Sequence, residues 1–371
     1  MSGKRVMVAM SGGVDSSVAA AILKDRGYQV IGVTMQIWPA ANNRSGGCCG
    51  LGAIEEARKV AYKLGIRHYV MNFRDAFARM VIDDFCREYS RGRTPNPCIR
   101  CNQHIKFDLL LNRARELDAD FIATGHYARI VTSPGGYRLL KAVDPAKDQS
   151  YFLYTLEPAQ LRQLLLPVGD LHKVEVRRLA TALGLPNAGR SDSQDICFVP
   201  DSGYHSFIAG HISSRPGDIV DTDGRVLGQH RGLAYYTVGQ RRGMGLASDG
   251  RLYVLRLDTD HNRLVAGSSD QLLAGRLFAS HLTWTSGESP QRSGGITAKI
   301  RSRAAEVAVK KLRISNGTAE VQFAEPQQAM APGQAVVFYR GEVVLGGGIA
   351  EGPEFAPGGK RDKQVSDAVL C

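Results

Sequence analysis

Two features of this sequence have the chemistry of an active site, and the first is a glycine-rich stretch near the amino end. The stretch VAMSGGVDSSVAAAIL (residues 8–23) passes from an apolar run to a helical pattern through two adjacent glycines, three serines and one carboxylate, Asp15. Glycines let the backbone approach a ligand closely, and the free N–H groups at the start of a helix stabilise phosphate. The stretch therefore predicts a phosphate-binding turn in which Asp15 suits Mg²⁺; a glycine turn without a ligand is the alternative.

Cysteines are the second feature, and they lie in two stretches far apart. Cys98 and Cys101 belong to GRTPNPCIRCNQHIKF (92–107), ahead of a helix that we expect to begin near Ile105. A thiol close to a helix N-terminus and to basic side chains has a lowered pKa and is more nucleophilic. Cys197, in SDSQDICFVP (191–200), lies between two apolar residues and by its neighbours alone is typical of a buried core cysteine.

The composition favours a soluble protein with a polyanionic partner. The chain has 371 residues, 43% of them hydrophobic and 22% charged, which is enough for two or three domains. The formal net charge of +11 favours a polyanion, and a basic surface that only keeps the protein soluble is the alternative. No signal peptide or membrane span is recognisable, so we expect a cytoplasmic protein that binds no membrane. In that compartment the seven cysteines do not indicate a disulfide framework.

The elements that must position these residues alternate along the first half of the chain. Short apolar runs predict strands at Arg5–Met10, Val30–Met35, His68–Phe73 and Asp120–Thr124. Amphipathic patterns predict helices at Val14–Arg26, Ala53–Leu64, Asp75–Tyr89 and Ile105–Leu117. Such alternation is typical of an open α/β domain with a parallel sheet, which binds ligands at the carboxyl ends of its strands.

The second half of the chain has a different texture. A helical pattern, EVRRLATALGLP (175–186), closes a first domain that we place at 1–209. Short β-type runs separated by Asp-Gly turns then predict a small β-rich domain over 210–272. Further runs predict a β-barrel over 273–351, and the tail at 352–371, rich in Gly and Pro, is expected to be disordered.

With these elements in place, the glycine turn resembles a known family signature. Ser11, Gly12, Gly13, Asp15 and Ser16 match the Ser-Gly-Gly-x-Asp-Ser signature of PP-loop ATP pyrophosphatases, whose domain is adenine nucleotide alpha hydrolase-like. The family splits ATP between the α and β phosphates and adenylates a substrate oxygen. Together with ATGHYAR (123–129), KDQSYFLY (147–154), both cysteine stretches and PGQAVVFYRGEVVLGGGIAE (332–351), nearly the whole chain resembles the tRNA-specific 2-thiouridylases.

The resemblance implies roles for individual residues. ATP would be bound by Ala9, Met10, Ser11, Gly12, Gly13, Val14, Asp15, Ser16, Met35 and Gly125. Cys101 matches the nucleophilic cysteine and Cys197 the cysteine that carries a persulfide. Asn96, Pro97 and Cys98 match the segment beside the target base. The remaining tRNA contacts would be His126, Lys147, Asp148, Gln149, Arg301, Ser302 and Gln334; for His126, a core histidine is the alternative.

The activity that the resemblance implies is ATP-dependent thiolation of C2 of the wobble uridine in tRNAs for lysine, glutamate and glutamine. ATP and Mg²⁺ would be required, sulfur would come from a cysteine desulfurase or a sulfur relay protein, and a Cys101–Cys197 disulfide would release the product. Many members have an aspartate at the position of Cys98. The departure leaves a second route open, in which Cys98, Cys101 and Cys197 hold a [4Fe–4S] cluster that carries the sulfur. A PP-loop enzyme that forms a C–N bond, or an RNA-binding protein without catalysis, are the rival interpretations.

Three features are left without an assigned role. Cys48 and Cys49 lie in a glycine-rich loop, where a part in sulfur relay is conceivable. The stretch YYTVGQRRGMGL (235–246) combines aromatic and arginine residues that could grip an RNA backbone, and a hairpin with a solvated loop is the alternative. In the expected barrel, a plausible phosphate track is formed by Arg301, Arg303, Lys310, Lys311 and Arg313.

Overall fold

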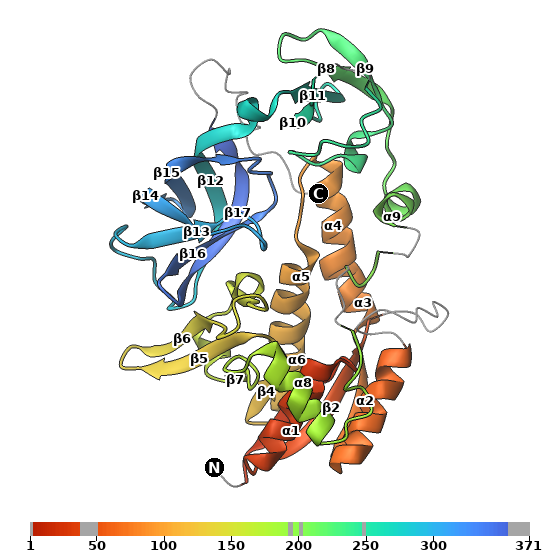
Figure 1. The fold of residues 1–371 in the computed structure, drawn as a ribbon, viewed down its shortest axis with the longest axis vertical. Helices are drawn as coiled ribbons and strands as arrows, with labels where there is room; N and C mark the ends of the chain where they lie inside the picture. The colour runs from red at the N-terminus through yellow and green to blue at the C-terminus, as the bar shows by residue number, and fades with distance from the viewer. Residues whose placement is uncertain (1–2, 38–50, 192–195, 200–202, 247–249, 355–371) are drawn as a thin grey trace.

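The computed structural model describes residues 3–37, 51–191, 196–199, 203–246 and 250–354. Figure 1 shows an elongated molecule with a parallel-sheet domain at one end, a small sheet at the other and a β-barrel alongside. Helices α4 (Asp83–Ser90) and α5 (Pro97–Arg100) form a column between the two ends. No helix in the described ranges is long and apolar enough to span a bilayer. Cys48 and Cys49 lie outside the described residues.

The parallel sheet has the architecture that the alternating pattern predicts. Its strands are β1 (Arg5–Ala9), β2 (Gln29–Gln36), β3 (Arg67–Asn72), β4 (Phe121–Ala123) and β7 (Leu164–Leu165). They run parallel in the order β3-β2-β1-β4-β7, so β1 lies at the centre. Helices α1 (Val14–Asp25) and α2 (Leu51–Leu64) follow β1 and β2. Val6, Met7 and Val8 at the middle of β1 are fully buried, as in a sheet covered on both faces.

The helix that we predicted at Ile105–Leu117 begins eight residues earlier, at Pro97. We expected a helix from Ile105, with both cysteines ahead of it; instead α5 starts at Pro97 and continues without a break through a π-helix, η2 (Cys101–Leu109), into α6 (Leu110–Glu116). Asn96 is the N-cap, and its side-chain Oδ1 accepts hydrogen bonds from the Cys98 and Ile99 amides at 3.2 and 3.4 Å. A proline at the first position follows the usual preference of helix starts.

The other helical elements are short. The pattern predicted at Asp75–Tyr89 is α3 (Arg74–Phe77), a π-helix η1 (Ala78–Ile82) and α4. The remaining α-helices are α7 (Pro158–Leu161), α8 (Lys173–Ala182) and α9 (Tyr204–His211), and three 3₁₀ turns are η3 (Ser150–Leu153), η4 (Leu233–Tyr235) and η5 (Ser269–Leu272). Helix α8 ends before Gly184, whose φ of +59° only glycine adopts readily.

The small sheet has the order β10-β11-β8-β9 and is the β-rich part expected in the middle of the chain. Its strands are β8 (Gly217–Val220), β9 (Val226–His230), β10 (Tyr253–Asp258) and β11 (Arg263–Gly267). Ile219, Val254 and Leu264 are fully buried at its centre. This sheet therefore has an apolar core of its own.

The barrel closes because β12 pairs with both β15 and β17. Its strands are β12 (Leu273–Trp284), β13 (Ile296–Lys299), β14 (Val307–Ser315), β15 (Thr318–Gln328), β16 (Ala335–Arg340) and β17 (Val343–Glu354). The last strand passes the point where we expected disorder to begin: Gly352 pairs with Phe278, and the chain from 355 lies outside the described residues.

A hairpin from the parallel-sheet domain extends the barrel, which the sequence pattern did not indicate. Strands β5 (Ala128–Ser133) and β6 (Gly136–Lys141) join the edge of β17 through the pair Leu140–Val343. Arg129 and Glu342 form a salt bridge of 2.9 Å across the same junction. The hairpin thus holds the barrel next to the segment that follows β4, which ends at Ala123.

Candidate active site

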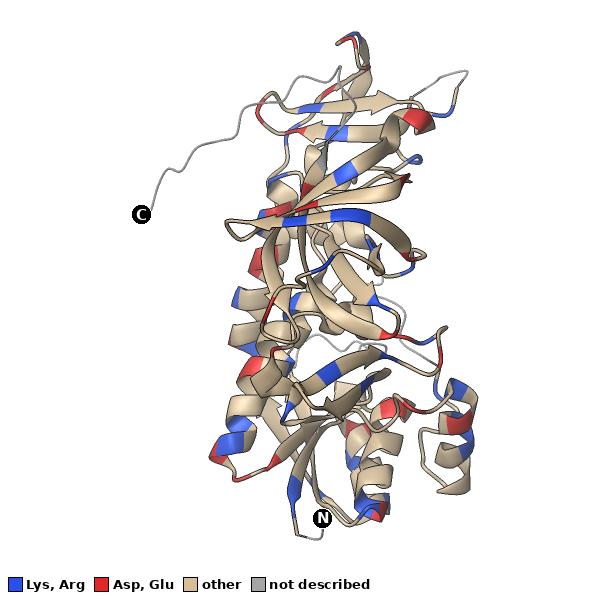
Figure 2. Ribbon diagram, turned by 90° about the vertical axis from the view of Figure 1, so that its left-hand side faces the viewer, with Lys and Arg blue, Asp and Glu red and all other residues tan. Residues whose placement is uncertain are grey.

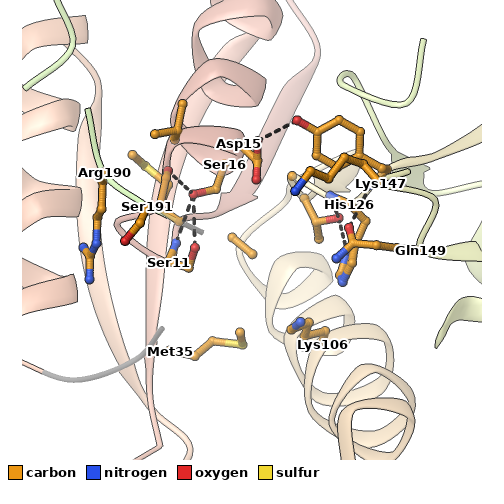
Figure 3. Close-up of a pocket in the computed structure, with 17 residues that line it drawn as sticks. Ser11, Asp15, Ser16, Met35, Lys106, His126, Lys147, Gln149, Arg190 and Ser191 are labelled. Carbon is orange, nitrogen blue, oxygen red and sulfur yellow. Dashed lines mark hydrogen bonds between the residues drawn. The ribbon is translucent and has the colours of Figure 1, made fainter. Parts of the chain in front are cut away.

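A cavity of about 320 Å³ opens at the carboxyl ends of β1 and β4 (Figure 3). Ser11, Ser16, Arg190 and Ser191 lie on one side of it, and Lys106, His126, Lys147 and Gln149 on the other. Its lining residues are Ala9, Met10, Ser11, Gly13, Val14, Asp15, Ser16, Met35, Lys106, Thr124, Gly125, His126, Tyr127, Lys147, Gln149, Arg190 and Ser191. All residues predicted to bind ATP line the cavity except Gly12, and so do three of those predicted to contact tRNA.

The turn between β1 and α1 leaves the helix N-terminus open to the cavity. Gly13 is the N-cap of α1 and supplies no side chain to cap it. The Ser16 hydroxyl accepts from the Ser11 amide at 3.2 Å and donates to the Gly13 carbonyl at 3.1 Å, which fixes the shape of the turn. Unsatisfied N–H groups and the helix dipole attract an anion at such a place. The geometry suits a phosphate group.

Gly12 and Gly125 lie where a side chain would clash with the backbone of a neighbouring element. A Cβ on Gly12 would lie 2.5 Å from the Ala53 carbonyl oxygen in α2, and its φ is +70°. A Cβ on Gly125 would lie 2.5 Å from the Ser16 amide nitrogen. Since both obstacles are backbone atoms, neither position accepts a larger residue without a shift of an element. Gly12 therefore supports the cavity from behind rather than lining it.

Asp15 is held by two partners that are distant in sequence. The Tyr127 hydroxyl donates to Asp15 Oδ1 at 2.7 Å, and Lys173 Nζ lies 2.6 Å from the same oxygen. Lys173 is the first residue of α8, and its side chain is only 10% exposed. Both bonds end on Oδ1, so Oδ2 carries neither of them. A carboxylate oxygen beside a phosphate-sized site is the kind of ligand that Mg²⁺ prefers.

The chain after α8 supports the turn from the other side. Asn187 is buried, and its Nδ2 donates to the Gly12 carbonyl and to the Ser17 hydroxyl, both at 2.9 Å. Arg190 donates to the same Gly12 carbonyl at 3.2 Å while lining the cavity. These residues, with Lys106, Thr124, Tyr127, Lys173 and Ser191, were not among our predicted site residues. Four of them lie inside stretches that we had singled out: Thr124 and Tyr127 in ATGHYAR, Lys106 in the first cysteine stretch and Ser191 in the second.

His126 is neutral in this site. Burial, and secondarily the nearby Lys106 ammonium, hold the pKa of His126 well below its ordinary value. Its Nδ1 lies 2.7 Å from the Thr124 hydroxyl, and its ring lies 6.0 Å from that of Phe107. The residue is thus both packed against the core and exposed to the cavity. A neutral imidazole there can exchange hydrogen bonds with a bound group but adds no charge.

The two predicted catalytic cysteines pack against the same apolar cluster. Cys101 is the first residue of η2 and Cys197 precedes Phe198; both are half-buried, whereas Cys98 is exposed. Phe198 is fully buried, with its ring 5.0 Å from that of Phe85 and 6.0 Å from that of Phe77. These aromatic contacts hold the segment of Cys197 against the helices that lead to Cys101. The loop residues 192–195 and 200–202 lie outside the described residues.

The residues do not fit an iron–sulfur cluster. Within the described ranges, no three His, Cys, Asp or Glu side chains are grouped so that they could hold a metal ion. Cys98, Cys101 and Cys197 therefore do not form the ligand set that a [4Fe–4S] cluster requires. Reaction steps through such a cluster are not supported.

The other residues predicted to contact tRNA fall into two groups. Asp148 is structural: its carboxylate accepts from the Ala142 and Ser150 amides, and its side chain is 6% exposed, so it has no free face for RNA. Arg301, Ser302 and Gln334 lie on the barrel, and Gln334 donates to the Thr94 carbonyl at 2.8 Å. Thr94 is two residues before Asn96. These three residues therefore do not line the cavity, and Gln334 contacts the segment just ahead of α5.

Comparisons with known proteins first define the class. Three family models match the chain in succession. The model described as "tRNA methyl transferase HUP domain" matches residues 4–201, the one described as "tRNA methyl transferase PRC-barrel domain" matches 205–268, and the one described as "Aminomethyltransferase beta-barrel domain" matches 274–350. These descriptions agree with the three-part fold: a parallel-sheet domain, a small sheet and a barrel.

Full-length relatives give the particular family. The chain is 50% identical over 355 residues to the tRNA-specific 2-thiouridylase MnmA of Moorella thermoacetica, covering 93% of this chain and 99% of the relative. It is 49% identical over 357 residues to that of Geobacter metallireducens, covering 93% and 96%. Identity at this level along both chains outweighs the methyl transfer mentioned in the domain descriptions. The chain belongs to the tRNA-specific 2-thiouridylase family.

Proposed function

We propose that this protein is a cytoplasmic enzyme that uses ATP to replace the C2 oxygen of a tRNA wobble uridine with sulfur. The observation that carries the proposal is the cavity at the end of β1. It combines an open helix N-terminus, a carboxylate, basic side chains and a neutral histidine. Open amides at a helix N-terminus are suited to phosphate, and the relatives named above are tRNA-specific 2-thiouridylases.

The residues around the cavity divide the work of the first step. The amides at the start of α1 would bind the phosphates, with Lys147, Lys106 and Arg190 as counter-charges. Asp15 would hold Mg²⁺, which would neutralise charge on the departing pyrophosphate. Met35 and Gly125 would border the adenosine. The uridine O2 then attacks the α-phosphorus, pyrophosphate leaves, and C2 carries AMP as a good leaving group.

Sulfur transfer would use the two cysteines outside the cavity. The terminal sulfur of a persulfide on Cys197, loaded by a sulfur donor protein, adds to C2 and AMP departs. The Cys101 thiolate then attacks the Cys197 sulfur; the S–S bond to the base breaks, and its electron pair stays on the sulfur bound to C2. A Cys101–Cys197 disulfide remains, and an external dithiol must reduce it before the next turnover. Asn96, Pro97 and Cys98 would lie beside the flipped base.

The decisive experiment separates adenylation from sulfur transfer. Purified protein is incubated with unmodified tRNA, ATP and a persulfide donor; pyrophosphate release is followed, and 2-thiouridine is measured by nucleoside mass spectrometry. Cys101→Ser and Cys197→Ser variants are expected to release pyrophosphate but to form no 2-thiouridine. The matched control is Cys86→Ser, because burial and Asp83 raise the pKa of that half-buried thiol and it lies outside the cavity.

Two results would contradict the proposal. Wild-type protein that releases no pyrophosphate with any tRNA would exclude adenylation of RNA. Thiolation that persists in Cys197→Ser would exclude Cys197 as the sulfur carrier. A C–N ligase, the rival among PP-loop enzymes, would lose nothing on replacement of Cys101.

A further inference from the structure

The three parts of the molecule meet along one seam beside the start of α5. On the catalytic side, the Thr94 amide donates to the Pro332 carbonyl at 2.7 Å, and the Thr94 carbonyl accepts from Gln334. A Cβ on Gly333, whose φ is +87°, would lie 2.8 Å from the Thr94 amide nitrogen. The backbone of the barrel is therefore in close contact with the segment that leads to Asn96.

The seam continues from the barrel to the small sheet. Arg301 donates to the Ala329 carbonyl. A Cβ on Gly239 would lie 2.6 Å from that of Ala329 and 3.5 Å from the Arg301 guanidinium. Gly239 in turn donates to the Val254 carbonyl at 2.8 Å, inside the small sheet. A path of direct contacts thus joins the helix that carries Cys101 to the loop that begins at Gly239.

This loop borders a second cavity, of about 250 Å³. The cavity is lined by Arg241, Gly243, Met244, Gly245, Leu246, Gly250, Arg251 and Leu252. Met244 is buried and packs with Leu246 and Leu252 on the core of the small sheet. These apolar side chains hold the loop on the sheet, and the two exposed arginines border the cavity. The glycines leave room for a ligand to approach the backbone.

In the described ranges, no carboxylate pairs with the arginines at this cavity. Arg241, Arg242 and Arg251 are exposed, and within the described part of the chain none of them has a carboxylate partner. Other arginines in the molecule do, as Arg93 does with Glu88 and Glu351. Figure 2 shows basic and acidic residues mixed along the molecule, so overall charge alone does not select this place. What distinguishes this place is the local combination of guanidinium groups, glycines and a cavity.

We propose that the cavity between Arg241 and Arg251 binds a backbone phosphate of the tRNA. The inference rests on the proposed function, and it adds a contact at the far end of the molecule from the ATP site (Figure 1). Guanidinium groups bind phosphate through two parallel hydrogen bonds, and such contacts position an RNA without reading its sequence. The site would hold the body of the tRNA while the wobble base enters the catalytic cavity.

The test compares two double variants that remove the same charge. Arg241→Gln/Arg251→Gln loses the arginines of the cavity, and Arg225→Gln/Arg263→Gln loses two exposed arginines of the same sheet outside it. Dissociation constants for unmodified tRNA are measured at several salt concentrations. Only the first variant is expected to bind roughly tenfold more weakly, with a salt dependence whose slope is lower by about 1 to 2, as expected for one or two lost phosphate contacts. Pyrophosphate release at saturating tRNA should stay at the wild-type rate.

The outcomes are distinguishable from failure of the proposed function. Equal affinity and slope in both double variants would overturn the phosphate site while leaving thiolation intact. Binding of inorganic pyrophosphate is also measured directly with the wild type and the first variant. If the first variant loses pyrophosphate binding but keeps its affinity for tRNA, the cavity is not a tRNA phosphate site. A wild type that binds no tRNA would refute the proposed function itself. Thermal melting of each variant verifies that the small sheet is folded.

Discussion

At the scale of single residues, the centre of the candidate site is the Asp15 carboxylate. A hydroxyl and an ammonium group fix one of its oxygens, and both donors come from segments more than 100 residues away. Lys173 is nearly buried, so its charge acts in a medium less polar than water. We regard Lys173 as a positioning residue that orients the other carboxylate oxygen toward the cavity.

Replacement of Lys173 tests this role. Lys173→Met keeps the length of the side chain but removes the charge, and we expect the KM for ATP to rise by about tenfold, equivalent to about 1.4 kcal/mol. Tyr127→Phe removes one hydrogen bond and is expected to have a smaller effect, about 1 kcal/mol or less. Pyrophosphate release measured against ATP concentration gives both values. An unchanged KM in a folded Lys173→Met protein would contradict the assignment.

The neutral His126 makes a prediction about pH. Its pKa is lowered in the folded protein, so below about pH 6.5 the unfolded chain takes up a proton that the folded chain does not. Stability from this residue is present above the unfolded pKa and is lost as the pH falls, by up to about 1.4 kcal/mol per pH unit. Thermal melting at pH 7.5, 6.5 and 5.5 should show a smaller acid destabilisation for His126→Gln than for wild type. Equal losses would show that the pKa of His126 is the same in the folded and the unfolded chain.

At the scale of elements, close packing of β4 against α1 shapes the cavity. The chain leaves β4 through Gly125, directly over the first turn of α1, where there is no space for a methyl group. Helix α5 contributes in another way, because the Asn96 cap fixes the first turn and with it the direction of Cys98 and Cys101. The positions of Asp15, Cys98 and Cys101 thus follow from how a helix begins, whereas Cys197 lies outside any helix.

Gly125→Ala tests the packing. The added methyl group would clash with the Ser16 backbone, and we expect a loss of stability of about 1–3 kcal/mol together with weaker ATP binding. Gly135→Ala is the matched control, since no atom lies within 4 Å of the added carbon. It should change stability by less than about 0.5 kcal/mol. Urea unfolding and ATP titration provide the two readouts; a Gly125→Ala protein as stable as the control would show that the elements can separate.

At the scale of the whole molecule, the barrel is attached to the catalytic half by two further contacts besides those of Thr94. The β5–β6 hairpin extends the barrel sheet, and Arg93 bridges Glu88 of α4 to Glu351 of β17. Burial would raise the pKa of Glu351, but the bonds from Arg93 and Ser280 outweigh it and lower that pKa. These contacts hold the barrel against the catalytic half.

Arg93→Gln should loosen this attachment. The change leaves Glu351, whose side chain is 36% exposed, without its cation, which we expect to cost about 1 kcal/mol or less of docking energy because solvent screens the pair. The affinity for tRNA should fall more than the affinity for ATP, because only tRNA spans both parts. Arg91→Gln, on an exposed arginine of the same turn, is the control. Equal ATP and tRNA affinities in Arg93→Gln and wild type would contradict a role in docking.

The sequence by itself determined the parallel sheet, the glycine-rich turn at the end of β1 and the barrel. These depend on local patterns: apolar runs, helical periodicity and glycines at a strand-to-helix junction. The early start of α5 was also within reach, because Asn96-Pro97 is a local capping signal that we read as part of a loop. Only the tertiary structure decided the partners of Asp15, the support of Gly12 by Asn187 and Arg190, and the seam from Thr94 to Gly239. These contacts join residues tens to hundreds of positions apart, and they form only once the order of the strands and the docking of the barrel have brought distant segments together.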